Sequence, residues 1–399
     1  MPSRVFGPNP SLTSMTRLIL LLLLGNALLL SSCVDRYVPD VPPTERSNLV
    51  VDGYINPLGS TVIKLSRTFS VNTKNTPPAE ARAQVVIQDN AGRRYPLTEA
   101  PAGTYTSAAQ TLDPGRQYQL RITTAQGREY ASDLESAIIT PPIADLTWQL
   151  TDVQGVQIYL TTRATSTDAR YYRWEYDETY QYTSAFQSAL EYVASSNTVE
   201  NRPAARQIYT CWRTQPSTAI LQSNTEQLSQ NVLVDYPLLL VLPDNRLKLG
   251  YSVLVRQVAQ TQGEYDYWER QRKNTESLGT VNDQLPGRVT GNVHALADAA
   301  EPVLGYVGVH SVVEKRLFID GNQLPTPRPG SVFYDPFYAP CTPPRGILPN
   351  AFYLQQFRDG FLIPIRRDDM TPDIIYVNTP NCVDCRERGG TNLKPSFWP

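Results

Sequence analysis

The sequence predicts a mainly β fold with two immunoglobulin- or fibronectin-like β-sandwich domains, the second elaborated with one α-helix and long C-terminal loops. Short segments of alternating apolar and polar residues recur along the chain, and turn residues separate them. The chain holds 23 Tyr and 33 Pro among its 399 residues, a composition typical of strands joined by loops. Each expected domain also carries an aromatic residue at a position typical of a sandwich core.

Residues 1–32 have the pattern of a lipoprotein signal peptide. Two arginines and no acidic residue precede an apolar run that starts at residue 18, and the sequence Leu-Ser-Ser-Cys33 ends it. A lipoprotein signal peptidase requires small residues before a cysteine, because the thiol takes a diacylglycerol before cleavage. We therefore expect Cys33 to be lipidated and to begin the mature chain. The alternatives are an uncleaved anchor helix and a start of translation at Met15.

Residues 33–46 combine prolines with charges and are expected to be a tether, whereas residues 47–140 are expected to form the first, immunoglobulin-like sandwich. The motif Leu-x-Pro-Gly-x-x-Tyr, which ends at Tyr118, resembles a tyrosine corner, in which the Tyr hydroxyl bonds to upstream backbone. An exposed Tyr after a turn is the alternative. The expected strands are Leu49–Ile55, Thr61–Thr68, Ala83–Asp89, Arg93–Leu97, Gln117–Thr124 and Arg128–Leu134.

Residues 141–399 are expected to form the second, fibronectin-like domain with a Pro- and aromatic-rich C-terminal region. Trp174 lies in its third strand, where a Trp is typical of a sandwich core. Residues 184–206 are polar and irregular, which indicates a loop or a weak helix. The expected strands are Leu146–Leu150, Val156–Thr162, Tyr171–Tyr180, Gln207–Arg213, Ala219–Leu221, Leu247–Val258, Val303–Val309 and Val312–Ile319.

One helix is expected over residues 262–278. Thr261-x-x-Glu264 has the spacing of a capping box, in which each side chain accepts a hydrogen bond from the other residue's backbone N–H. Tyr265 and Trp268 share one side of this helix, and such a stripe is usually part of a core.

Besides Cys33 the chain holds four cysteines, Cys211, Cys341, Cys382 and Cys385. An even number in an exported chain indicates disulfides. We expect Cys382 and Cys385 to pair with Cys211 and Cys341 rather than with each other, because a disulfide within Cys-x-x-Cys closes a small, strained ring. Zinc binding, redox chemistry and free thiols are the alternatives.

No catalytic residue, metal site or cofactor is predicted. Serine-hydrolase chemistry needs a His beside an activated Ser, but the two histidines, His294 and His310, accompany no Gly-x-Ser-x-Gly motif. His310 is interpreted as a packed or surface residue, and Asp368-Asp369 as a solvated turn. No zinc-protease, phosphate-loop or dinucleotide motif is present, and a formal net charge of −2 does not suggest nucleic acid as a partner. A site built only from carboxylates stays open.

Several segments resemble one family when they are taken together with the cysteine at the end of the signal. These segments begin at Tyr251, Tyr265, Val289, Glu301 and Lys315, and the last is the tail Cys-x-x-Cys-Arg-x-x-Gly-Gly-Thr-Asn-x-Lys-Pro-x-Phe-Trp. With them, the sequence is similar to the Bacteroidota lipoproteins grouped as domain of unknown function 4249. The resemblance implies an outer-membrane location, often in the company of TonB-dependent receptors, and it implies no activity and no catalytic residues.

These observations together predict a lipid-anchored, non-catalytic protein of the outer membrane that serves as an accessory of a TonB-dependent receptor. The expected contact is the Pro- and aromatic-rich segment 324–350, because aromatic side chains on a stiff loop bind at a low ordering cost. Packing of these rings over the sandwich is the alternative. Two other functions stay open, a glycan-binding surface module and an envelope hydrolase with a carboxylate site. The aromatic contact candidates are Phe333, Tyr334, Phe337 and Tyr338.

Overall fold

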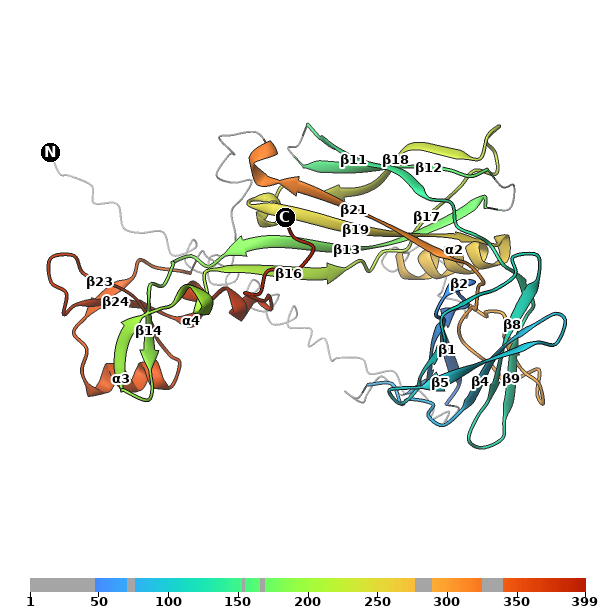
Figure 1. Cartoon of the computed structure of the whole chain (residues 1–399), viewed down its shortest axis with the longest axis horizontal. Coiled ribbons are helices and arrows are strands. Elements are labelled where there is room, and N and C mark those ends of the chain that lie inside the picture. The colour runs from blue at the N-terminus through green and yellow to red at the C-terminus, as the bar shows by residue number, and fades with distance from the viewer. Residues whose placement is uncertain (1–46, 70–75, 153–154, 166–168, 277–288, 325–339) are drawn as a thin grey trace, which may run out of the picture. The chain divides into compact units, whose positions relative to one another are not determined.

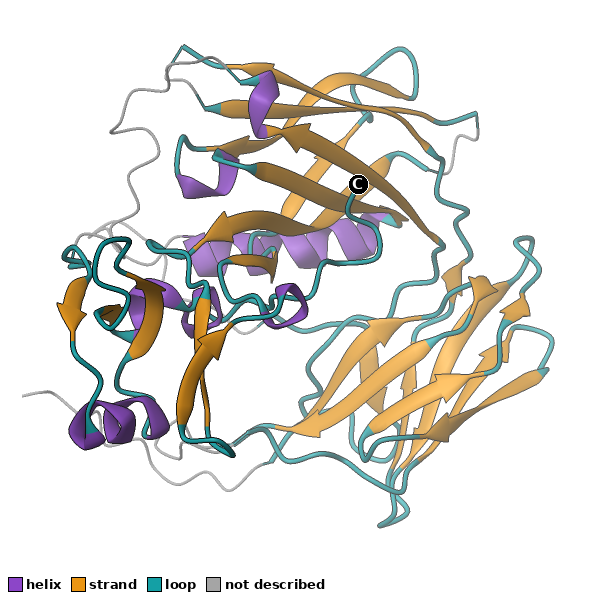
Figure 2. Cartoon of the chain, turned by 60° about the vertical axis from the view of Figure 1, so that its left-hand side comes forward, coloured by secondary structure: helices purple, strands orange, loops and turns teal. Residues whose placement is uncertain are grey.

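The computed structural model describes residues 47–69, 76–152, 155–165, 169–276, 289–324 and 340–399 (Figure 1). The expected signal peptide, Cys33, the tether and the four aromatic contact candidates all lie outside the described residues. Strands dominate and helices are few (Figure 2), which confirms the prediction of a mainly β fold. Among the described helices, none has the length and apolar character that crossing a membrane requires.

The first module is a β-sandwich whose strands pair in the order β1-β3-β6-β5-β4-β8-β9-β20. Burial alternates along its strands, as in β8, where Tyr118, Leu120 and Ile122 point into the core. Its strands are β1 Leu49–Tyr54, β2 Leu58–Gly59, β3 Val62–Arg67, β4 Gln84–Asp89, β5 Arg94–Glu99, β6 Thr104–Ser107, β7 Gln110–Thr111, β8 Gln117–Thr123, β9 Glu129–Ser132, β10 Glu135–Ser136 and β20 Val293–Ala295.

A distant part of the chain completes this first module. Strand β20 pairs with β9, and residues 304–309 form parallel bridges to β1 and to the residue directly after it, through the pairs Val50–Leu304 and Ile55–Val309. Val303, Val307 and Val309 belong to the same core as β1. The pattern alone predicts that this segment belongs to the second domain, and that prediction is wrong, because strand patterns do not reveal which distant strand is the partner.

The tyrosine corner is confirmed. Tyr118 is fully buried, and its hydroxyl donates a hydrogen bond to the backbone oxygen of Asp113, 2.9 Å away. The turn between these residues is therefore fixed to the strand that follows it.

The second module is also a sandwich of two sheets. One sheet has the order β11-β12-β18 and the other β16-β13-β19-β21, with β17 beside β13. A single core takes Ile158 and Leu160 from the first sheet and Trp174 and Val253 from the second. Trp174 is buried as predicted, and its ring N–H donates to Gln257, 2.9 Å away. The strands are β11 Ile143–Leu150, β12 Val156–Arg163, β13 Tyr171–Thr183, β16 Thr210–Pro216, β17 Leu221–Asn224, β18 Val232–Val241, β19 Gly250–Gln260 and β21 Val312–Asp320.

The predicted helix is α2, Gln262–Glu276, and it directly follows β19. The Thr261 hydroxyl accepts a hydrogen bond from the backbone N–H of Glu264 over 3.3 Å, which is one half of the predicted capping box. The other half is missing, because the Glu264 carboxylate turns to Gln260 and His310 instead. Tyr265 and Trp268 are half-buried, whereas Tyr267, which the sequence analysis did not single out, is the buried aromatic residue of this helix.

The C-terminal module consists of residues 184–206 and 340–389. Residues 184–206 contain the hairpin β14–β15, so the prediction of a loop or weak helix is wrong there. The hairpin shares a core with helix α3 and a small sheet of order β22-β24-β23. These elements are too short for an alternating sequence pattern to predict them, and their shared core stabilises them. They are β14 Leu190–Val193, β15 Thr198–Asn201, β22 Arg345–Ile347, α3 Ala351–Arg358, β23 Ile363–Arg367, β24 Ile375–Asn378, α4 Pro380–Val383 and the 3-10 helix η5 Cys385–Arg388.

Candidate functional site

Two disulfides hold the C-terminal module. Cys211 pairs with Cys385 and Cys341 with Cys382, with Cα atoms 5.7 Å apart in each pair. The prediction that both cysteines of Cys-x-x-Cys pair outside the motif is confirmed, and the structure supplies the connectivity that the sequence left open. Since Cys211 lies on β16, the first bridge attaches the C-terminal module to the second sandwich.

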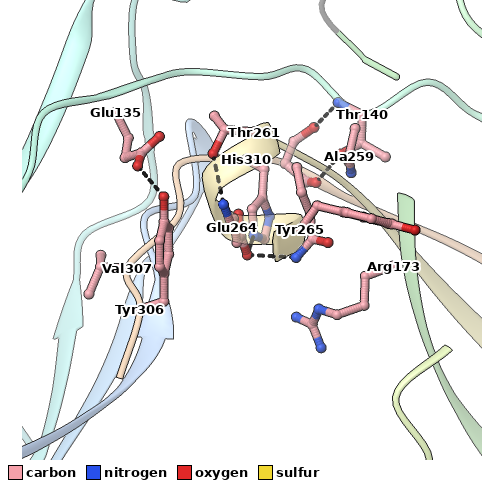
Figure 3. Close-up of polar contacts among 12 residues, drawn as sticks. Glu135, Thr140, Arg173, Ala259, Thr261, Glu264, Tyr265, Tyr306, Val307 and His310 are labelled. Atoms are coloured by element: carbon pink, nitrogen blue, oxygen red, sulfur yellow. Dashed lines mark hydrogen bonds and ion pairs between the residues drawn. The ribbon is translucent and has the colours of Figure 1, made fainter. Parts of the chain in front are cut away.

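A buried Glu–His pair joins helix α2 to the first module (Figure 3). Nε2 of His310 lies 3.3 Å from the Glu264 carboxylate, and the two side chains are only 1% and 4% exposed. The same carboxylate oxygen accepts a hydrogen bond from Gln260 over 2.8 Å. Among the described residues, the second carboxylate oxygen and Nδ1 of His310 have no hydrogen-bond partner.

Aromatic and cationic groups surround this pair. The Tyr54 ring stacks on His310 with 4.5 Å between centroids. Burial raises the pKa of Glu264, but the charge and hydrogen bond of His310 and the nearby charge of Arg173 outweigh it, and the pKa lies below its ordinary value. The Arg173 guanidinium in turn lies 4.4 Å from the Trp268 ring centroid.

The close approach of helix α2 depends on a glycine. A Cβ added to Gly308 would lie 2.1 Å from the Glu264 carboxylate, so no larger residue fits while the carboxylate keeps its place. The sequence segment around Gly308 therefore positions Glu264 as much as the helix does.

A second carboxylate lies on the other side of the same helix terminus. Glu135 accepts a hydrogen bond from the Tyr306 hydroxyl, and burial raises the pKa of the Glu135 carboxyl. Tyr306 also packs against Tyr267 of α2, with 5.4 Å between ring centroids. These contacts extend the polar junction between α2 and the first module.

The buried pair suits a positioning role better than catalysis. A catalytic acid or base must reach substrate, and neither Glu264 nor His310 is accessible. The interpretation of His310 as a packed residue is confirmed. Its partner was missed because the two residues are 46 positions apart and neither stands in a known motif.

The other chemical candidates have structural roles. Asp368 accepts hydrogen bonds from the backbone N–H groups of Met370 and Thr371, which confirms the predicted turn and lowers the pKa of its carboxyl. Within the described ranges, no group of three or more His, Cys, Asp or Glu side chains is arranged to hold a metal ion.

The C-terminal module exposes large apolar side chains. Five described apolar side chains are more than 60% exposed, and four of them belong to this module; the fifth is Leu393. We refer to these four as the apolar surface of the C-terminal module: Leu348 at 62%, Phe352 at 63%, Phe361 at 62% and Met370 at 95% exposed. Four of the five side chains lie in this one module, which makes it the candidate contact region among the described residues.

The solved structures that resemble this chain are distant. The FN1–FN3 domains of chicken CNTN1 are 11% identical, with a TM-score of 0.18, and the match covers 53% of this chain and 62% of that one. A DUF4785 family protein from Legionella pneumophila is 15% identical, with a TM-score of 0.19, and 53% and 52% are covered. The Yersinia pseudotuberculosis adhesin InvE is 18% identical, with a TM-score of 0.14, and 54% and 55% are covered.

The chain thus spans less than two thirds of each of these structures, and at such scores the likeness carries no argument about function. No curated protein matches the sequence. A family model, however, matches residues 34–316, which is most of the chain and includes both sides of the Glu264–His310 junction. The chain therefore belongs to the family described as domain of unknown function DUF4249.

Proposed function

We propose that this protein is a lipid-anchored, non-catalytic lipoprotein of the outer membrane that binds a protein partner through its C-terminal module. The partner that we propose is a TonB-dependent receptor or the cargo of such a receptor. The observation that carries the proposal is the apolar surface of Leu348, Phe352, Phe361 and Met370.

This surface is suited to binding because a packed core and two disulfides hold the module beneath it. Phe352 lies on α3 and Phe361 follows that helix, and the helix packs on a small core through Phe357. Both disulfides end in the same module. A partner would therefore gain apolar contact without the entropic cost of ordering a loose chain.

The proposed membrane anchor rests on the sequence before residue 47. The signal-like residues 1–32 end at Cys33, and two or three acyl chains hold a protein to a bilayer durably. The two disulfides agree with an oxidising, exported setting.

Photocrosslinking in native membranes tests the proposal. A crosslinkable residue at Phe352 should capture a membrane protein, whereas the same residue at Leu58, which is 52% exposed in the first module, serves as the matched control. Phe352→Asp together with Phe361→Asp should abolish capture by a crosslinkable residue at Met370. Capture only at Leu58, or none at any position, would contradict the proposed function, as would a hydrolase turnover that disappears when a single Asp or Glu is replaced.

A further inference from the structure

A cavity of about 300 Å³ lies in the C-terminal module, and none of the four exposed apolar side chains lines it. Its walls come from the hairpin β14–β15, the end of α3, strand β23 and the α4–η5 segment. Both disulfides fix one wall, because Cys382 and Cys385 flank Asp384. Ligand cavities start near 300 Å³, so this one has room for a single small ring.

One part of the cavity lining is apolar. Phe357, Leu362, Pro364 and Pro380 contribute carbon surface to it. Such a wall accepts the C–H face of a ring and would not bind a fully polar ion.

The charged lining residues are three carboxylates, Glu191, Asp384 and Glu387, and one guanidinium, Arg202. Two guanidinium groups outside the lining pair with two of these carboxylates. Arg206 lies 2.6 Å from Glu191, which Arg202 also approaches at 3.6 Å, and Arg386 contacts Asp384 over 2.6 to 3.1 Å. These three carboxylates and three guanidinium groups together carry no net charge, so the site does not select an ion by charge.

The cavity lining holds one hydrogen-bond donor and one acceptor that bind no described residue. Nε of Arg202 donates a hydrogen bond to the Ser188 hydroxyl. Its Nη1 donates to the backbone oxygen of Arg206 and forms an ion pair with Glu191, while its Nη2 has no partner among the described residues. Glu387 likewise makes no side-chain hydrogen bond or ion pair to a described residue. The Arg202 side chain is only 12% exposed, and this burial lowers the pKa of its guanidinium.

We infer that this cavity binds an uncharged, hydroxyl-rich ring, that is, one sugar unit. Each sugar hydroxyl both donates and accepts, so adjacent hydroxyls match the free Nη2 of Arg202 and the free carboxylate of Glu387. The C–H face of the ring packs on Phe357 and Leu362. None of the four side chains of the proposed protein contact lines this site, although Phe361 stands between the lining residues Gly360 and Leu362, and the inference does not rest on that contact.

The inference is tested by comparing the binding of neutral, cationic and anionic forms of one sugar ring. The mature chain, labelled at the methyl groups of Leu and Ile, is titrated with neutral hexoses and N-acetylhexosamines, and then with the amino sugar and the uronate of the same ring. Shifts at Leu362 and Ile363 locate binding to the cavity. A neutral ring should bind in the millimolar range, and the cationic and anionic forms should bind at least several-fold more weakly.

Two variants with a matched control complete the experiment. Glu387→Gln and Arg202→Gln should each weaken binding about tenfold, because each removes one charge-assisted hydrogen bond. Asp369→Asn removes an exposed carboxylate of the same module outside the lining and should leave affinity unchanged. Glu387 is exposed, so its variant should fold normally even if Arg202→Gln does not.

Three results would overturn the inference. They are no shift at Leu362 and Ile363 with any neutral sugar up to 50 mM, tighter binding of a charged form, and binding that Glu387→Gln leaves unchanged. None of these results bears on crosslinking at Phe352, so failure of the sugar site and failure of the proposed protein contact are distinguishable.

Discussion

At the scale of single residues, the sequence predicts local motifs but not pairs of residues that are far apart in the chain. Tyr118 could be predicted because Pro, Gly and Tyr within a few positions define its corner. Only one half of the predicted capping box forms, because a buried partner, His310, competes for the Glu264 carboxylate. That competition depends on how strands far apart in sequence come together, and no local pattern encodes it.

Breaking the buried Glu264–His310 pair should destabilise the fold strongly. Glu264→Gln is expected to lower the free energy of unfolding by about 3–5 kcal/mol, since it removes one partner of a pair whose side chains are only 1% and 4% exposed. The chain provides a matched control in Asp133 and His294, which are also 3.3 Å apart but about 60% exposed. Asp133→Asn should cost less than about 1 kcal/mol. Equal effects of both variants in denaturant titrations would contradict the structural role of the buried pair.

The same pair should make stability depend on pH. The pKa of Glu264 is lower in the folded chain than its ordinary value of 4.5, so its stabilising contribution is present above pH 4.5. That contribution is lost as the pH falls below 4.5 through the folded-state pKa. Denaturant titrations from pH 7 to pH 3 should therefore show a steeper loss of stability in the native chain than in Glu264→Gln. Parallel curves would show that Glu264 titrates normally.

At the scale of elements, length decided what the sequence could predict. The long strands β13 and β19, of 13 and 11 residues, alternate clearly and were expected, as was α2. The hairpin of β14 and β15 has four residues in each strand, too few for a period to emerge. Disulfides and a shared core, rather than strand propensity, stabilise those short elements.

The tyrosine corner should contribute measurably to the first module. Tyr118→Phe removes only the hydroxyl that binds the backbone oxygen of Asp113, an oxygen that also accepts a hydrogen bond from the backbone N–H of Arg116. We expect a loss of about 1 kcal/mol in the free energy of unfolding, the net contribution of one hydrogen bond. The control is Tyr192→Phe, which removes an exposed hydroxyl bonded to Asn197 and should cost less than about 0.5 kcal/mol. An unchanged free energy of unfolding in Tyr118→Phe would show that this hydrogen bond does not stabilise the first module.

At the scale of the whole molecule, the second sandwich is closed by the far end of the chain. Trp398 packs on Trp212 and Phe318, with ring centroids 6.4 and 5.9 Å away, and the Arg316 guanidinium lies 3.6 Å from the centroid of the Phe397 ring. The sequence showed these aromatics in a tail but not the sheet that they cover. Such contacts became visible only when the strands were placed.

The two disulfides should differ in their effect on stability. The bridge between Cys211 and Cys385 spans 174 positions, whereas that between Cys341 and Cys382 spans 41. Because a longer closed loop restricts the unfolded chain more, the double Ser variant of the first pair should lose about 5 kcal/mol and that of the second about 4 kcal/mol. Calorimetry of the two variants checks this order. The reverse order would show that native packing, not chain entropy, sets the difference.

A fragment that ends at residue 140 should not fold. It lacks β20 and residues 303–309, which supply Val293, Val303, Val307 and Val309 to the first core. Loss of several buried apolar side chains exceeds the usual stability of a small domain. A dispersed amide NMR spectrum from residues 47–140 alone would contradict this expectation.

The late segment 303–309, which completes the first core, also determines when that core can fold in the cell. If the protein is exported N-terminus first, the early strands emerge from the translocation channel long before the segment around Val309 that covers them. Their apolar faces stay open to water during that interval, when aggregation or capture by a periplasmic chaperone competes with completion. Both sandwiches would then mature almost together, after more than three quarters of the chain has crossed the membrane.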